Sequence, residues 1–209
     1  YVILIGERGG FLMIKASIVG ATGYTGIELI RLLLQHPETE LIHLVSHSQA
    51  GEKLADVYQQ FRGLEEIVLE EYDADKLTDS DIVFTALPHG ISQDVVAELY
   101  QQGIKVIDLS GDFRYKSKEK YEKWYGIEHK HADLFDKVVY GLVEMNRDKI
   151  KDADIIANPG CYPTASTLGI LPILKEDIAD CNSIIVDAKS GVSGAGKTLK
   201  SVTHYIEAN

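Results

Sequence analysis

The sequence predicts an α/β protein whose first part is a doubly wound, mostly parallel sheet and whose last part begins an α+β domain. Three observations support this prediction. Short apolar strands alternate with amphipathic helices from Lys15 onward, a glycine-rich turn follows the first strand, and the turn Asn158-Pro159-Gly160 follows a later one. Alternation of this kind is typical of a parallel sheet covered by helices.

The predicted elements follow the periodicity of the apolar residues. Apolar runs predict strands at 16–19, 41–45, 81–87, 106–109, 154–157 and 184–188. Helical spacing predicts helices over 26–35, over 92–102 with Ser92 as N-cap, and from Cys161 until Pro172 stops the pattern. Segment 116–137, rich in charges and aromatic rings, is predicted to be a surface excursion carrying Trp124 and Tyr125. Because ligands bind beyond the carboxyl ends of such strands, we expect 22–26, 88–90 and 110–114 to converge on one cleft.

Composition limits the classes of protein. The 209 residues are 45% hydrophobic and 25% charged, as in a globular chain of one or two domains, and no apolar stretch approaches the roughly 20 residues that span a bilayer. The formal charge of -11 argues against nucleic acid or an anionic membrane as partner. Two cysteines, Cys161 and Cys181, are too few for a disulfide framework, so we expect a reducing compartment, the cytoplasm. Residues 1–12 lack the pattern of a signal peptide and are expected to be an extension or non-native leader before a natural start at Met13.

The turn Gly20-Ala21-Thr22-Gly23-Tyr24-Thr25-Gly26 is a variant of the dinucleotide fingerprint. Its three glycines permit a tight turn, a close approach of the backbone to a pyrophosphate, and close packing of the helix. The turn follows a predicted strand and opens a predicted helix, which indicates a Rossmann-type domain. The residues expected to bind the dinucleotide are Gly20, Thr22, Gly23, Tyr24, Thr25 and Gly26.

The end of the second predicted strand distinguishes the two nicotinamide dinucleotides. An acidic residue there would hold the ribose 2′-hydroxyl of NAD. The sequence has Ser46-His47-Ser48 instead, followed by Lys53. Hydroxyl groups and a cation suit a 2′-phosphate, so NADP(H) is the expected cofactor and Ser46 one of its ligands.

Cys161 lies where the predicted strand 154–157 turns into a helix. Unpaired amides and the positive end of the helix dipole favour a thiolate there, and the same amides can hold an oxyanion on an attacked carbonyl. A buried structural cysteine is the alternative. The Asn-Pro-Gly turn and Pro163 near the helix entry favour the nucleophile, so we expect Cys161 to be catalytic.

The segment Gly191–Thr198, GVSGAGKT, matches the P-loop pattern GxxxxGK(S/T) and follows the predicted strand 184–188. A P-loop nucleoside triphosphatase is therefore an alternative. It would need a helix after Thr198 and a downstream acidic strand for magnesium, and only 199–209 follow. A glycine loop that lines the active cleft is the preferred interpretation.

Six spaced motifs together resemble the N-acetyl-gamma-glutamyl-phosphate reductase family. In order they are GATGYTG, ALPHG (86–90), DLSGDFR (108–114), YGLVEMNR (140–147), NPGCYPT and SGVSGAGK (190–197). The resemblance runs from about Met13 to the last residue, and the wider fold group includes aspartate-semialdehyde dehydrogenase. It implies NADPH-dependent reduction of N-acetyl-L-glutamyl 5-phosphate to N-acetyl-L-glutamate 5-semialdehyde, through a cysteine thioester, in arginine biosynthesis. It also implies an NADP-binding domain at 13–147 and the beginning of a catalytic (dimerisation) domain at 148–209, truncated at the C-terminus.

The resemblance extends to individual residues. It implies that Pro88, Ser193 and Gly194 contact the cofactor and that Ser110 and His204 lie near the substrate. The alternatives are a rigid turn for Pro88 and a generic helix-face histidine for His204. Arg114 has the planar fork that grips a carboxylate or phosphate, with a surface ion pair to Asp112 or Glu119 as the alternative. In the family, the cysteine works with a histidine acid/base in a motif farther downstream than Asn209. We therefore expect the 209 residues to be an incomplete enzyme.

Three other hypotheses stay open. A lysine-pathway reductase of carrier-bound aminoadipyl phosphate shares these motifs, an aspartate-semialdehyde dehydrogenase shares the cysteine chemistry, and a truncated NADP-binding protein would act only through association. The expected partner is a small acyl phosphate, with no nucleic acid and no membrane. Histidine spacing predicts no metal site. The complete protein is expected to be a homo-oligomer.

Overall fold

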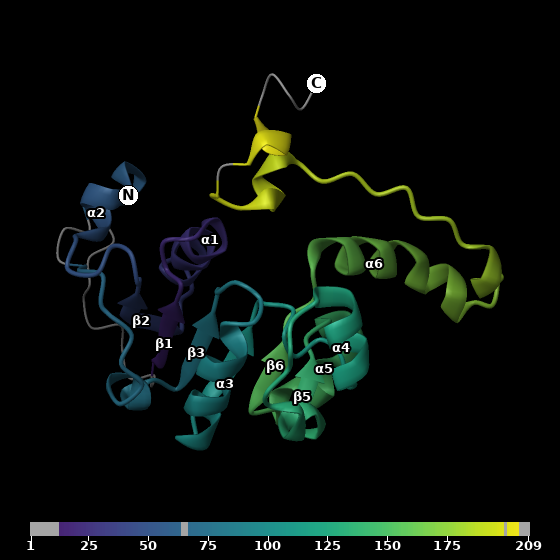
Figure 1. The fold of residues 1–209 in the computed structure, drawn as a ribbon, viewed down its shortest axis with the longest axis horizontal. Coiled ribbons are helices and arrows are strands. Elements are labelled where there is room, and N and C mark those ends of the chain that lie inside the picture. Colours follow the sequence, from purple (N-terminus) through teal and green to yellow (C-terminus); the bar gives the residue numbers. More distant parts are fainter. Residues whose placement is uncertain (1–12, 64–66, 199, 205–209) are drawn as a thin grey trace.

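The computed structural model describes residues 13–63, 67–198 and 200–204, and one six-stranded parallel sheet forms its centre (Figure 1). Every pair of neighbouring strands runs parallel. In spatial order the strands are β2 (Thr39–Val45), β1 (Ile14–Val19), β3 (Ile82–Thr85), β4 (Lys105–Asp108), β6 (Ile155–Ala157) and β5 (Val138–Tyr140). The predicted doubly wound parallel sheet is confirmed.

Helices connect these strands. The α-helices are α1 (Tyr24–Leu33), α2 (Leu54–Val57), α3 (Ser92–Gln101), α4 (Lys118–Tyr125), α5 (Val143–Lys151) and α6 (Cys161–Lys175). Short 3-10 turns lie at Gln59–Phe61, Lys76–Asp79, Ala132–Lys137, Cys181–Ser183, Val192–Ala195 and Ser201–Thr203. Within the described ranges, none of these helices has both the length and the apolar composition needed to cross a membrane.

Alternation along the strands builds a hydrophobic core on each face of the sheet. Ile18 and Leu44 belong to one cluster of buried side chains, together with Ile27 and Ile30 of α1. Their neighbours in sequence, Val19 and Val45, belong to a second cluster with Val96 and Leu99 of α3. Because successive side chains of a strand point to opposite faces, two clusters of this kind require helices on both sides of the sheet.

Three predicted local features differ from the structure. Ser92 is not an N-cap, because its hydroxyl is buried and donates to the Asp108 carboxylate at 2.6 Å. Pro172 does not end α6, which continues to Lys175. Segment 184–188 forms no strand, because no strand among the described residues lies beside it, and Ile185 is 92% exposed.

Segment 116–137 is also more than a surface excursion. Trp124 is exposed, as expected, but Tyr121 of α4 is fully buried and its hydroxyl donates to the Asp112 carboxylate at 2.8 Å. His129 is buried as well, with Nε2 2.8 Å from the Asp112 carbonyl oxygen, and burial lowers its pKa below the usual range. The segment therefore covers one end of the sheet with aromatic rings.

The sheet continues past the expected domain boundary at 147, which falls inside α5. Strand β6 pairs with β4 and β5 in the same sheet, and α6 starts directly after the turn that follows β6. None of the side chains of α6 is buried. Figure 1 shows the chain leaving the far end of α6, running back above it, and ending in 3-10 turns above α1.

His43 of β2 joins two acidic residues on the segment that follows the second strand. Its Nδ1 lies 3.0 Å from Glu70 and its Nε2 3.0 Å from Asp79. Burial lowers the pKa of His43, but the hydrogen bonds to Glu70 and Asp79 outweigh this and raise it above the usual value of 6.5. The two contacts of the imidazole therefore link 70–79 to the edge of the sheet.

We expect His43→Gln to lower the free energy of unfolding by about 1 kcal/mol at pH 6, the magnitude of a partly exposed ion pair. A histidine whose pKa is raised on folding stabilises fully below its unfolded value of 6.5, and the stabilisation is lost as pH rises through the folded pKa. Urea unfolding of both proteins from pH 5.5 to 8.5 measures the difference, with the exposed His36→Gln as control. A difference that stays constant with pH would contradict the assignment.

Candidate active site

The loops that follow β1, β3 and β4 meet at the carboxyl edge of the sheet, as predicted. The Gly90 amide donates to the Asp112 carboxylate at 2.9 Å, and the Gly111 amide donates to His89 Nδ1 at 2.7 Å. Gly20, at φ +93°, lies so close to the next strand that an added Cβ would be 2.9 Å from the Ala86 carbonyl carbon. Three loops from adjacent strands therefore form one surface.

The turn 20–26 has the shape that a dinucleotide pyrophosphate requires. A Cβ on Gly26 would lie 2.7 Å from the Ala21 carbonyl group, so only glycine lets α1 pack this closely on the turn. The first helical residue is Tyr24, and the Gly23 cap forms no side-chain hydrogen bond to the first turn. The first-turn amides and the helix dipole are thus available to an anion.

The end of β2 fits a 2′-phosphate better than a bare diol. Ser46 is buried, with its Oγ 2.8 Å from Thr22 Oγ1, so the structure brings these two predicted residues together. His47 and Ser48 follow it on the surface, and the exposed Lys53 precedes α2. No carboxylate occupies 46–48 to hold a ribose diol.

Asp108 and Asp112 organise the loop after β4. Asp108 is buried and accepts hydrogen bonds from the hydroxyls of Thr85, Ser92 and Ser110 at 2.6 to 2.8 Å. Burial raises the pKa of Asp108 above its usual range, and these hydrogen bonds offset the rise in part. Ser110 also accepts from the Asp112 amide at 3.0 Å, so its hydroxyl is buried inside the loop.

Cys161 is the first residue of α6 and is exposed. The preceding cap, Gly160, forms no side-chain hydrogen bond to the helix, and its carbonyl oxygen accepts from the Thr164 amide at 3.0 Å. The amides of Cys161 and Tyr162 thus lie in the first turn, where an α-helix offers no internal acceptor. The thiol can attack a carbonyl carbon, and the two adjacent amides can donate hydrogen bonds to the resulting oxyanion.

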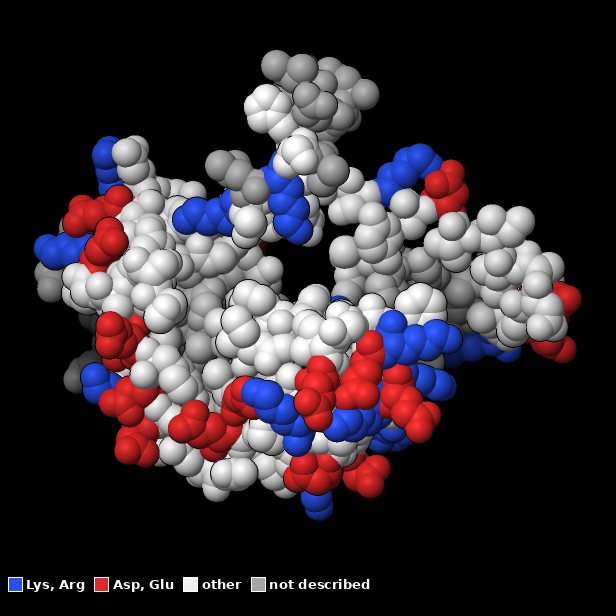
Figure 2. Space-filling model, viewed as in Figure 1, with Lys and Arg blue, Asp and Glu red and all other residues white. Residues whose placement is uncertain are grey.

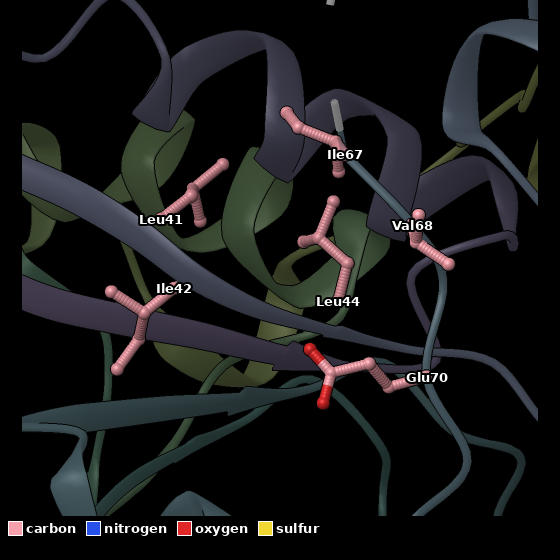
Figure 3. Close-up of a pocket in the computed structure, with 6 residues that line it drawn as sticks. All are labelled: Leu41, Ile42, Leu44, Ile67, Val68 and Glu70. Carbon is pink, nitrogen blue, oxygen red and sulfur yellow. The ribbon is translucent and has the colours of Figure 1, made fainter. Parts of the chain in front are cut away.

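Cys161 lines a hollow of about 390 Å³ between α6 and the segment after it. Its polar lining residues include Ser166, Ser190, and an ion pair between Asp187 and Lys189 at 2.6 Å. A second hollow, of about 380 Å³, lies at the outer strand β2 and is lined by five apolar side chains and Glu70 (Figure 3). Of these two hollows, the first is lined by a thiol and the second is not.

Arg114 lies between the β4 loop and the Cys161 turn. Its Nε donates to the Asn158 carbonyl oxygen and its Nη2 to the Leu109 carbonyl oxygen, both at 2.8 Å. Its Nη1 lies 3.0 Å from where a Cβ on Gly160 would be. Among the described residues, Arg114 forms no ion pair with Asp112 or Glu119, which was the alternative.

The other predicted site residues are exposed. Pro88 begins the turn before α3, and Ser193 and Gly194 lie in the 3-10 turn Val192–Ala195. His204 follows the last described 3-10 turn. The P-loop fold is not formed in the described part of the chain, because no strand lies between α6 and Gly191 and no α-helix follows Gly191 there.

His89 lies in the segment 88–90 that was expected at the cleft, but the sequence analysis gave it no role of its own. It is exposed, its ring contacts that of Tyr125 at 4.8 Å, and its Nδ1 accepts the Gly111 amide, so a neutral ring carries its proton on Nε2. The signal lay in ALPHG, where a histidine directly follows the proline at the end of a strand.

The glycine turn 20–26 and a cysteine at the start of a helix lie on one parallel sheet, an arrangement typical of a dinucleotide-binding α/β protein. The family description "Semialdehyde dehydrogenase, NAD binding domain" matches residues 15–153, and the chain belongs to this family. The description "Semialdehyde dehydrogenase, dimerisation domain" matches residues 161–209.

Curated relatives confirm the resemblance inferred from the motifs. The chain is 58% identical over 198 residues to the N-acetyl-gamma-glutamyl-phosphate reductase of Halothermothrix orenii, covering 94% of this chain and 57% of that protein. It is 53% identical over 195 residues to the reductase of Caldicellulosiruptor bescii, covering 93% and 57%. The chain thus spans slightly more than half the length of these relatives.

Solved structures share the fold at lower identity. Aspartate semialdehyde dehydrogenase II of Vibrio cholerae, complexed with ASA, matches with a TM-score of 0.57 and 19% identity over 78% of this chain and 47% of that chain. Aspartate semialdehyde dehydrogenase of Candida albicans, with NADP, matches with a TM-score of 0.57 and 21% identity over 80% and 48%.

We expect Gly26→Ala to lower the free energy of unfolding by about 2 to 3 kcal/mol, because its methyl group would overlap the Gly20 and Ala21 backbone. Gly23→Ala is the matched control, because its methyl group would meet only the Gly20 carbonyl oxygen at 3.6 Å. The control should lose less than about 1 kcal/mol. Urea unfolding measures both variants, and equal losses would show that the turn is looser than described.

We expect Arg114→Lys to lower the free energy of unfolding by about 1 to 3 kcal/mol. A lysine ammonium cannot reach the Asn158 and Leu109 carbonyl oxygens together, so one of these two oxygens loses its hydrogen-bond donor. The control Arg147→Lys, on the exposed surface of α5, should change the free energy of unfolding by less than about 0.5 kcal/mol. Thermal unfolding compares the two variants. An unchanged stability of Arg114→Lys would show that the two hydrogen bonds of Arg114 to carbonyl oxygens do not stabilise the fold.

Proposed function

We propose that this chain carries the cofactor-binding part and the nucleophile of an N-acetyl-gamma-glutamyl-phosphate reductase, an NADPH-dependent oxidoreductase of arginine biosynthesis. The observation that carries the proposal is the position of Cys161. It is exposed at the start of α6, lines a hollow, and follows a strand of the same sheet whose first strand ends in the glycine turn. The identity to named reductases supports the choice among cysteine-dependent dehydrogenases.

Cys161 acts first, as nucleophile. Its thiolate attacks the acyl phosphate carbonyl carbon, the C–S bond forms, and the C–O bond to phosphate breaks, which leaves a thioester and releases inorganic phosphate. The amides of Cys161 and Tyr162 hold the oxyanion of the tetrahedral intermediate, because both lie in the open first turn of α6. When bound, NADPH supplies the hydride that reduces the thioester. Collapse of the hemithioacetal then frees the aldehyde and restores the thiol.

The glycine turn would hold the pyrophosphate, with Gly20, Gly23 and Gly26 giving the backbone its close approach. Thr22, Tyr24 and Thr25 would line the same turn, and Pro88 would lie against the nicotinamide. Ser46, with Ser48 and Lys53 nearby, favours the 2′-phosphate of NADP(H) over NAD(H). Ser193 and Gly194 would contact the cofactor from segment 190–197, the second glycine loop.

The substrate side of the site combines Arg114, Ser110 and His204. Arg114 has Nη1 directed toward the Gly160 turn, so the guanidinium can serve both the backbone clamp and an anionic group of the substrate. Ser110 shapes the loop through Asp108. His204 supplies an imidazole from the last described turn, and a further acid/base is expected in the part of the relatives that this chain does not span.

The proposal includes a cytoplasmic location, a small acyl phosphate as partner, and a homo-oligomer for the complete protein. A carrier-bound aminoadipyl phosphate is the second candidate substrate. The charge of -11 disfavours it, because the acidic carrier proteins of that pathway would be repelled.

We expect iodoacetamide to label Cys161 at least about tenfold faster than Cys181 at pH 7, because only Cys161 lies in the first turn of an α-helix. Both cysteines are exposed, so access does not separate them. Peptide mass spectrometry measures the two rates. Equal, slow labelling of the two cysteines would contradict the assignment of Cys161 as the nucleophile.

We also expect Cys161→Ser to abolish the reverse reaction, the phosphate-dependent reduction of NADP by N-acetylglutamate 5-semialdehyde, while the Kd for NADPH stays unchanged. The alcohol cannot form the thioester, and Cys161 lies outside the glycine turn. Activity retained in Cys161→Ser would exclude the thioester route.

A further inference from the structure

Segment 190–197, the second glycine loop, carries Lys197, and this lysine lies close to the glycine turn 20–26. Lys197 Nζ donates to Tyr58 Oη at 2.9 Å and lies 5.2 Å from the centre of the Tyr58 ring. Tyr58 Oη in turn donates to the Thr22 carbonyl oxygen at 2.7 Å. A cation from the C-terminal segment is thus one hydroxyl group away from the turn 20–26, although 139 residues separate Lys197 from Tyr58.

The charge of Lys197 is not neutralised by a carboxylate. Among the described residues, the ion pairs do not include this ammonium, whose partners are a neutral hydroxyl and an aromatic ring. A chain with a formal charge of -11 must gather cations locally to bind a multiply charged anion. Figure 2 shows an opening below the C-terminal segment, with Lys or Arg side chains at its upper rim.

Two further groups at the same place favour an anion. The first turn of α1 begins at Tyr24, two residues after Thr22, and presents open amides. The hydroxyls of Thr22 and Ser46, 2.8 Å apart, lie on the side toward the end of β2. Phosphate oxygens accept hydrogen bonds from an ammonium, from open amides and from whichever hydroxyl of this pair does not donate to the other.

We propose that Lys197 binds a phosphate group of the dinucleotide cofactor and that Tyr58 positions its ammonium over the glycine turn. The inference rests on the proposed function and adds to it a residue and a role for the lysine of the P-loop-like segment. The chemistry is that of a phosphate, and it is common to the pyrophosphate and to the ribose 2′-phosphate.

The test is the Kd for NADPH and for NADH, measured by titration calorimetry on the 209-residue chain and its variants. Lys197→Met should weaken NADPH binding about tenfold, the loss of one charge-assisted hydrogen bond. Lys200→Met, an exposed lysine on the same segment, is the matched control and should stay within about twofold. Equal weakening for NADH assigns Lys197 to the pyrophosphate, and weakening for NADPH alone assigns it to the 2′-phosphate.

Tyr58→Phe tests the positioning role, because it keeps the ring and removes the hydroxyl. It should weaken NADPH binding about threefold in the parent chain and have no further effect in Lys197→Met, since the two groups act as a unit. Independent effects would overturn the role of Tyr58.

The remaining outcomes separate this inference from the proposed function. A parent chain that binds neither dinucleotide would overturn both. Normal binding by the parent chain, with Lys197→Met indistinguishable from Lys200→Met, would overturn the inference alone. Binding of MgATP that is lost in Lys197→Met, with NADPH binding unchanged, would replace it by a nucleoside triphosphate site.

Discussion

Two buried carboxylates, one at the end of β4 and one on the loop after it, hold the cleft together. The described hydrogen bonds to the Asp108 and Asp112 carboxylates come from neutral donors on β3, the loop after β3, α3, α4 and Ser110. A buried carboxylate is stable only when such donors satisfy its oxygens, so each donor must stay in place. The loops after β3 and β4 are therefore fixed as one body.

This constraint extends to the thiol. The same loop carries Arg114, whose guanidinium bonds the Leu109 carbonyl at the start of the loop and the Asn158 carbonyl in the turn after β6. That turn leads directly into α6 and Cys161. The Cys161 thiol is thus positioned by the hydrogen bonds of the turn before α6, rather than by burial of α6, none of whose side chains is buried.

Much of the fold and the glycine turn could be predicted because their signals are local. Alternating apolar runs and closely spaced glycines need only a few neighbouring residues. Ser92 was misassigned as a cap because its partner, Asp108, belongs to another strand. Segment 184–188 has the composition of a strand but has no neighbouring strand in the described structure. The Lys197 to Tyr58 contact joins distant segments, and no local pattern announces it.

The parallel sheet also sets the order in which the molecule can assemble. Ala16 of β1 pairs with Ile82 of β3, so these two neighbouring strands meet only after the whole of β2 and its following segment have been synthesised. Pairings of this kind must close a long loop before any contact repays the lost entropy, which makes folding slow. The hydrogen bonds of the cleft join loops from β3 and β4, and they can form only when those strands are already side by side. The geometry of the cleft thus depends on the pairing of β3 with β4, as a consequence of strand order.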